Sequence, residues 1–216
     1  MDAAELRLVA DAIRAGRPIA DHAFDRVYDG HTRRLSARHW TPIAVAARAA
    51  ALLVEGGASS VLDVGAGVGK FCIVGALVTG ASFTGIEERR DRLDVARRAA
   101  AAFDLSGIRW VLGRIERVAF ATFDGFYFFN PFAEALDHDP DAAPDPRGAA
   151  RFRRDVARAQ AALAAVRRGA RVVTYHGLGG AMPAGYRLVT REATITGPLE
   201  CWEKEAAPAA AGQRAA

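Results

Sequence analysis

The stretch of sequence that decides the fold runs Ser60-Val61-Leu62-Asp63-Val64-Gly65-Ala66-Gly67-Val68-Gly69-Lys70-Phe71. Its first five residues form a short, mostly apolar run, which predicts a buried strand, and the residues from about 68 to 78 predict a helix. The three glycines allow a tight turn and let the backbone approach a ligand where a Cβ would clash. The helix start presents unpaired N–H groups, which favour an anion such as a carboxylate. The stretch therefore predicts a strand, a ligand-binding turn and a helix.

Short strands and helices alternate on the C-terminal side of this turn. We expect strands at 82–86, 108–112, 124–129 and 170–175, with helices at 89–103 and 149–167 between them. The last predicted strands, 186–195 and 199–204, follow one another directly, which predicts an antiparallel pair. The pattern indicates an α/β fold whose parallel sheet is closed by an antiparallel edge. Ligands of such sheets bind at the carboxyl ends of the strands.

Three parts of the chain are predicted. Residues 1–40 form a helical N-terminal extension, with helices at 4–15 and 19–28 and a polar, basic stretch after them. The stretch 20–40 is either a lid over a substrate or a solvated connector, and the connector is the simpler interpretation. Residues 41–205 form the ligand-binding domain, which opens with a helix at 41–54. The Ala- and Pro-rich residues 206–216 are expected to be a disordered tail.

The composition is that of a protein with one hydrophobic core. Hydrophobic residues make up 51% of the 216 residues, but 48 of them are alanines. No stretch approaches the ~20 uninterrupted apolar residues of a membrane span, and the acidic start of the chain lacks the hydrophobic block of a secretory signal. Cys72 and Cys201 have no partner at metal-ligand spacing, which is typical of free thiols in a reducing compartment. We therefore expect a cytoplasmic protein without membrane contact.

The charge pattern bears on partners and metals. The net charge is +4, but the arginines that carry it are interleaved with acids along the predicted helices. Nucleic-acid binders usually cluster their positive charge, so this pattern argues against nucleic-acid binding. The aspartates between 137 and 145 alternate with prolines, which is typical of a flexible acidic loop. We expect no metal site.

Two acidic residues flank the glycine turn. Asp63 ends the first strand of the domain, and Glu87 follows the next one, 22 residues after Gly65. A carboxylate there can accept hydrogen bonds from both hydroxyls of a ribose, and acids stabilise a neighbouring ammonium or sulfonium group. The dinucleotide fingerprint would need a glycine at position 70, which is Lys70. The two acidic residues, Asp63 and Glu87, favour a ligand that is a cationic nucleoside without phosphates. S-adenosylmethionine has that chemistry.

On these motifs, the chain resembles class I S-adenosylmethionine-dependent methyltransferases over residues 58–204. Asp63-x-Gly65-x-Gly67-x-Gly69 matches their first motif and Glu87 their second. The residues around both motifs are similar to histone-lysine methyltransferases of the disruptor-of-telomeric-silencing type and to ATP-synthase c-subunit lysine methyltransferases. The resemblance implies a Rossmann-like, seven-stranded, mostly parallel sheet with an antiparallel C-terminal hairpin and helices on both faces. The cofactor-binding residues that it implies are Thr41, Asp63, Gly65, Ala66, Gly67, Gly69, Glu87 and Ile115.

Two of these assignments leave an alternative open. The Thr41 hydroxyl either binds the methionine carboxylate of the cofactor, as a similar Thr-Pro lead-in implies, or is a plain helix N-cap. After the third strand, relatives often carry an aspartate that binds the adenine amino group, but this chain has Arg114, which cannot accept a hydrogen bond. The adenine then rests on backbone groups near Ile115 or uses Glu116.

The segment Asn130-Pro131-Phe132 follows the fourth strand and supplies the predicted catalytic residues. It is similar to the Asn-Asn-Phe segment of the histone enzymes and to the Asn/Asp-Pro-Pro-aromatic motif of amino-methyltransferases. The resemblance implies that the Asn130 side chain and a backbone carbonyl accept hydrogen bonds from the target NH2 group, while Phe132 packs on the methylated group. The chain has one proline where that motif has two, and a plain strand-ending turn is the alternative.

These features together predict an S-adenosylmethionine-dependent methyltransferase that releases S-adenosylhomocysteine. We expect in-line methyl transfer to a nitrogen of a protein amino group, with protein lysine favoured over nucleic acid or a small molecule. An RNA, DNA or small-molecule methyltransferase is the alternative among enzymes. A member of the fold that binds the cofactor or a partner without catalysis is the alternative of another class. The sequence leaves the oligomeric state open.

Overall fold

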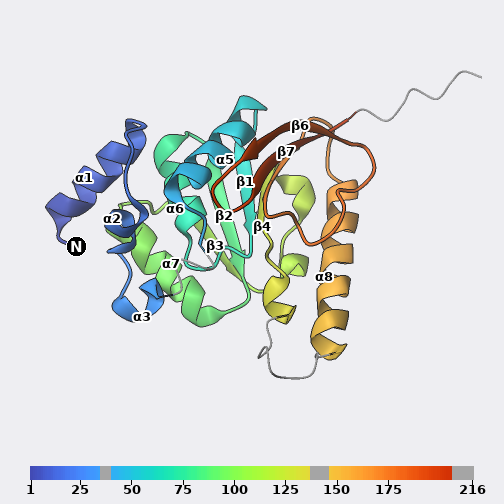
Figure 1. Cartoon of the computed structure of the whole chain (residues 1–216), viewed down its shortest axis with the longest axis horizontal. Coiled ribbons are helices and arrows are strands. Elements are labelled where there is room, and N and C mark those ends of the chain that lie inside the picture. The colour runs from blue at the N-terminus through green and yellow to red at the C-terminus, as the bar shows by residue number, and fades with distance from the viewer. Residues whose placement is uncertain (35–39, 137–145, 206–216) are drawn as a thin grey trace, which may run out of the picture.

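A computed structural model describes residues 1–34, 40–136 and 146–205, and seven strands of these ranges form one sheet in the order β3-β2-β1-β4-β5-β7-β6 (Figure 1). The strands are β1 (Ser60–Val64), β2 (Ser82–Glu87), β3 (Arg109–Leu112), β4 (Gly125–Phe129), β5 (Arg171–Tyr175), β6 (Tyr186–Ala193) and β7 (Pro198–Lys204). Strand β1 lies between β2 and β4 and is parallel to both, whereas β7 is antiparallel to β5 and β6. The predicted mostly parallel sheet with its antiparallel C-terminal hairpin is confirmed.

Helices cover both faces of the sheet. The longer ones are α1 (Ala3–Arg14), α5 (Ile43–Glu55), α6 (Lys70–Val78), α7 (Arg90–Ala102) and α8 (Pro146–Ala164). Val61 and Tyr127 are buried in one hydrophobic cluster with α5 and α6, whereas Leu62 and Phe126 are buried in another with α8. Because successive residues of a strand point to opposite faces, α8 lies across the sheet from α5 and α6 (Figure 1). None of the helices in the described ranges is long and apolar enough to cross a membrane.

The N-terminal residues share a core with the sheet. Val9 and Ile13 of α1, and Phe24 and Tyr28 after it, belong to the cluster that also holds α5 and α6. The helix predicted at 19–28 is correct in place but too long, since α2 covers only Asp21–Asp25 and the chain continues in i→i+3 turns. The short helix α3 (Gly30–Arg33) was not predicted and is capped by the Asp29 side chain.

The start of α5 differs from the prediction. Thr41 is not the N-cap, because α5 begins at Ile43 with Pro42 in the capping position. The Ile43 amide donates instead to Oδ1 of Asp21 at 2.9 Å, so a carboxylate distant in sequence does the capping. The Thr41 hydroxyl lies 2.7 Å from the hydroxyl of Tyr127 on β4. The predicted N-cap role of Thr41 is therefore wrong, because its hydroxyl is engaged with the sheet.

Several predictions concern residues outside the described part of the chain. They are the acidic loop at 137–145, the tail at 206–216 and part of the basic stretch, residues 35–39.

Candidate functional site

The glycine turn leaves β1 in a backbone conformation that favours glycine. Gly65, Gly67 and Gly69 have φ angles of +78°, +54° and +82°, in the left-handed region that other residues rarely adopt. The amides of Gly65 and Ala66 donate to the carbonyl oxygen of Ile86 at 3.0 and 2.9 Å, respectively. These hydrogen bonds tie the turn to β2. The positive φ angles of the turn are by themselves sufficient to require glycine at every second position.

The surroundings of the three glycines differ. A Cβ on Gly65 would lie 2.7 Å from Cβ of Pro131, and a Cβ on Gly69 would lie 2.5 Å from the ring of Trp110. A Cβ on Gly67 would meet no atom within 4 Å. Gly65 and Gly69 thus permit close packing, whereas Gly67 faces open space.

Glu87, the last residue of β2, lies beside this turn. Its Oε2 accepts a hydrogen bond from the Gly67 amide at 2.9 Å, and its Oε1 accepts one from the Arg89 amide at 2.9 Å. Both carboxylate oxygens of Glu87 therefore face the backbone of the turn and of the residues after β2. The side chain is only 5% exposed, yet it lines a cleft.

The cleft has a volume of about 720 Å³ and opens at the carboxyl ends of β1, β2 and β4, a size that suits a small-molecule ligand. The predicted site residues that line it are Gly65, Gly67, Glu87, Ile115, Asn130, Pro131 and Phe132. The predicted residues that are buried and do not line it are Thr41, Asp63, Ala66 and Gly69. Within the described ranges, no group of three or more metal-ligating side chains occurs.

Asp63 lies beneath the glycine turn, on the side of α6. Its Oδ2 accepts a hydrogen bond from the Cys72 thiol at 3.4 Å. Burial raises the pKa of Asp63 to about 7; the Cys72 hydrogen bond opposes this shift and the charge of Glu87 adds to it. The sequence led us to expect Asp63 beside a bound cation, but the structure places it behind the turn.

Asn130 forms the corner after β4. Its φ angle is +38°, a conformation that asparagine tolerates better than most residues, and its amide donates to the Gly177 carbonyl at 3.1 Å. Its side chain makes no hydrogen bond with any described residue. Phe129 and Phe132, its neighbours in the sequence, line the cleft as well. The side-chain amide therefore makes no protein contact that would keep it from a ligand in the cleft.

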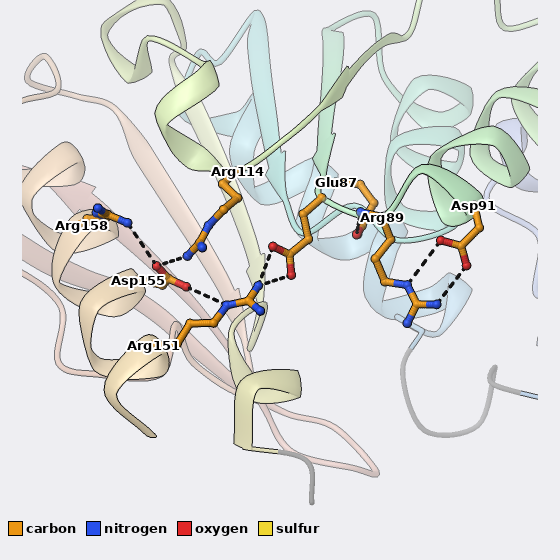
Figure 2. Close-up of polar contacts among 8 residues, drawn as sticks. Glu87, Arg89, Asp91, Arg114, Arg151, Asp155 and Arg158 are labelled. Carbon is orange, nitrogen blue, oxygen red and sulfur yellow. Dashed lines mark hydrogen bonds and ion pairs between the residues drawn. The ribbon is translucent and has the colours of Figure 1, made fainter. Parts of the chain in front are cut away.

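Arg114 lies in a polar cluster that sequence reasoning did not foresee. Figure 2 shows Arg114, Arg151 and Arg158 converging on the Asp155 carboxylate of α8. Arg151 also pairs with Glu88, so it links α8 to the residue that follows Glu87. Arg114, Arg151, Asp155 and Glu88 line the cleft. In the sequence, the α8 arginines match the solvated face of a helix, and only the fold brings Arg151 to the cleft.

The N-terminal segment supplies a wall of the same cleft. His31 and Thr32 of α3, together with Trp40, line it. Thr32 is held by Asp29, whose carboxylate accepts hydrogen bonds from both its amide and its hydroxyl at 2.8 Å. The sequence marked the stretch 20–40 only as a lid or a connector, and the packing of the segment shows that these residues reach the cleft.

Comparison with solved structures identifies the architecture. TrmN from Thermus thermophilus matches 80% of this chain with 24% identity and a TM-score of 0.52. An O-methyltransferase from Bacillus cereus in complex with S-adenosylhomocysteine matches 91% of the chain and 97% of its own, with 14% identity and a TM-score of 0.59. The chain has a methyltransferase fold. The predicted Rossmann-like architecture is thereby confirmed.

The same comparisons limit what is shown to the fold. An RNA methyltransferase from Salinibacter ruber in complex with S-adenosylhomocysteine matches 77% of the chain and 94% of its own, with 15% identity and a TM-score of 0.53. The chain spans about half of TrmN, 52% of its length. A scan against protein-family models finds no match, and neither does a search of curated proteins. None of these structures supports a lysine-methylating type in particular.

Proposed function

We propose that the chain is an S-adenosylmethionine-dependent methyltransferase that binds its cofactor in the cleft and releases S-adenosylhomocysteine. The observation that carries the proposal is the position of Glu87 beside Gly67, where an acceptor carboxylate and an open stretch of backbone face one cleft. Asn130 lines the same cleft. The structures from Salinibacter ruber and Bacillus cereus were crystallised with S-adenosylhomocysteine, which supports this choice of ligand.

The residues along the cleft fit this cofactor. Glu87 accepts hydrogen bonds from the ribose hydroxyls, and Gly67 leaves room for the ligand against the backbone. Among the described residues, no side chain caps the start of α6, so its first amides and the helix dipole favour the methionine carboxylate. Ile115 lines the side of the cleft proposed for adenine, where Arg114 is held by Asp155 rather than free to contact the base.

The predicted residues that do not line the cleft hold the turn from behind in this proposal. Asp63 contacts Cys72 of α6, and the Ala66 amide binds Ile86. Gly69 makes room for Trp110. Thr41 binds the hydroxyl of Tyr127, and the ring of Tyr127 stacks on a phenylalanine of α6 with centroids 3.8 Å apart. Their contribution to cofactor binding is therefore indirect.

Asn130 and the aromatic residues beside it orient the acceptor. When bound, S-adenosylmethionine supplies a methyl group that is bonded to a sulfonium sulfur. On transfer of the methyl group, that sulfur becomes a neutral thioether. The Asn130 side-chain oxygen would accept a hydrogen bond from the acceptor nitrogen and so hold the lone pair of that nitrogen toward the methyl group. Phe129 and Phe132 exclude water, and the proton displaced from the nitrogen passes to solvent.

We propose a nitrogen of a protein amino group as the acceptor, because an amide oxygen in a cleft that aromatic side chains also line suits an NH2 group. The neighbouring structures include an RNA methyltransferase and an O-methyltransferase, so RNA, DNA and small molecules are tested beside it. Methyl-labelled S-adenosylmethionine is incubated with the protein and host lysate. Label that is lost to protease supports the proposal, whereas label lost to nuclease or dialysis contradicts the protein acceptor. Absence of label in every fraction favours the non-catalytic alternative.

The cofactor assignment has its own test. Glu87→Gln removes the negative charge and half of the carboxylate's acceptors, so we expect S-adenosylhomocysteine to bind about tenfold more weakly or worse. Isothermal calorimetry measures the affinity. Glu55→Gln, at the exposed end of α5, is the control and should bind as the wild type does. Equal affinity in the wild type and Glu87→Gln would remove Glu87 from the site.

A further inference from the structure

Lys70, the residue directly after the glycine turn, carries a buried charge that the proposed chemistry does not use. Its side chain is 3% exposed, and its Nζ lies 2.6 Å from Oδ1 of Asp21 and 2.8 Å from Oδ1 of Asp25. It also lies 5.6 and 5.9 Å from the ring centroids of Phe24 and Trp40, respectively. The first residue of α6 is thus enclosed by the N-terminal segment.

Other contacts tie the same segment to the turn. The Tyr28 hydroxyl donates to the carbonyl oxygen of Val68, inside the turn, at 3.2 Å. Asp21 uses one oxygen for both Lys70 and the amide of Ile43 at the start of α5. Phe24 is fully buried and stacks on the ring of Phe103 at the end of α7, with centroids 5.2 Å apart. The segment therefore contacts the turn, α5 and α7 at once.

The anchored segment continues into the cleft wall. The Trp40 ring packs edge-on against Tyr28, with centroids 4.7 Å apart, and Trp40 lines the cleft with His31 and Thr32. Val68 and Gly67 of the turn line it as well. A displacement of the segment would thus change both the turn and one wall of the cleft.

The pair of Lys70 with Asp25 is buried, whereas the Asp21 side chain is 44% exposed. A buried ion pair is a costly way to hold two elements together, since well-packed apolar residues often give equal or greater stability. Its advantage is geometric, because the ammonium fits only where both carboxylates meet it. We propose that Lys70 is a positioning residue for the cofactor-binding turn, and that residues 21–34 are a fixed wall of the site rather than a mobile lid. The inference deepens the proposed function and rests on it only for the identity of the ligand.

The test compares Lys70→Met, Lys70→Met/Asp25→Asn and the wild type. Methionine keeps the apolar stem without the charge, and the second change removes the carboxylate left buried without its ammonium. Lys204→Met is the matched control, because Lys204 is the other lysine of the chain and also lies over an aromatic ring, 4.8 Å from the centroid of Tyr186. Thermal unfolding reports stability, and calorimetry reports the affinity for S-adenosylhomocysteine.

We expect Lys70→Met to bind S-adenosylhomocysteine about tenfold more weakly or worse, since the turn is no longer preorganised. The double variant should regain stability but not affinity, whereas Lys204→Met should bind as the wild type does. The proposal would be overturned if the double variant regained both stability and affinity, or if Lys70→Met bound S-adenosylhomocysteine as tightly as the wild type.

Hydrogen exchange of the ligand-free proteins separates this inference from the proposed function. Lys70→Met should speed amide exchange in both segments, 21–34 and 65–69, while exchange elsewhere stays as in the wild type. Unchanged exchange in these segments would overturn the positioning role. If the wild type does not bind S-adenosylhomocysteine, the proposed cofactor falls, and hydrogen exchange still decides whether Lys70 positions the turn.

Discussion

At the scale of single residues, Asp63 couples the site to pH. Burial raises its pKa to about 7, from the ordinary aspartate value of 3.8. Because the folded-state pKa is the higher one, the folded protein binds the proton more tightly than the unfolded chain. The stabilisation is fully present below the unfolded pKa and is lost as the pH rises through about 7. The native structure therefore favours a neutral Asp63 carboxyl group under weakly acidic conditions.

Replacement of Asp63 by asparagine should flatten this dependence. Between pH 6 and pH 8, the free energy of unfolding of the wild type should fall by about 1.4 kcal/mol more than that of Asp63→Asn, because one pKa unit corresponds to about that energy. Urea denaturation at both pH values measures the difference. Parallel pH profiles for the two proteins would show that Asp63 has an ordinary pKa.

Asn130 combines an available amide with a left-handed backbone, so its substitutions must be chosen with care. Asn130→Ala should lose about 1 kcal/mol of stability from backbone strain alone. Asn130→Gly removes the side chain without that strain, and we expect it to retain stability and lose methyl transfer. Thermal unfolding and single-turnover assays on an identified acceptor separate the two effects. If Asn130→Gly turns over as the wild type does, the side chain serves only the turn.

At the scale of elements, the glycine turn combines packing and binding at neighbouring positions. Gly65→Ala places a methyl group against Pro131 and strains the backbone, so we expect a larger loss of stability than for Gly67→Ala. Gly67→Ala should cost about 1–2 kcal/mol from its left-handed conformation, but its methyl group points into open space and should weaken S-adenosylhomocysteine binding. Calorimetry and thermal unfolding of both variants test this order. Equal ligand affinity in Gly67→Ala and the wild type would contradict the proposal that the ligand lies against Gly67.

At the scale of the whole molecule, the N-terminal residues belong to the main core. Deletion of residues 1–40 removes Val9, Ile13, Phe24 and Tyr28 from that core, and burying such a side chain contributes about 1.5–3 kcal/mol. The sum is comparable with a domain's whole stability of about 5–15 kcal/mol. We therefore expect the shortened chain to lose cooperative unfolding in circular dichroism. Deletion of residues 206–216 is the control, and a cooperative, stable 41–216 fragment would support a detachable extension.

Much of the fold follows from local patterns in the sequence. The alternation of apolar runs and helical periodicities predicted all seven strands, because burial on both faces of a sheet imposes short apolar segments. The glycine spacing after β1 and the acid at the end of β2 also marked the cleft in the sequence. Turn conformation and strand ends depend on residues close together in the chain.

The rest of the site depends on contacts between distant segments, which only the tertiary structure decided. Lys70 meets Asp21 and Asp25 across more than 40 residues, and Arg114 meets Asp155 across 41. Pro131, expected beside the acceptor, also packs against Gly65. The sequence by itself determined the strand–turn–helix unit, the order of the elements and the acid at the end of β2. Tertiary packing alone decided which side chains from α2, α3 and α8 lie around the strand–turn–helix unit and its cleft, because no local sequence pattern predicts which distant surfaces become neighbours.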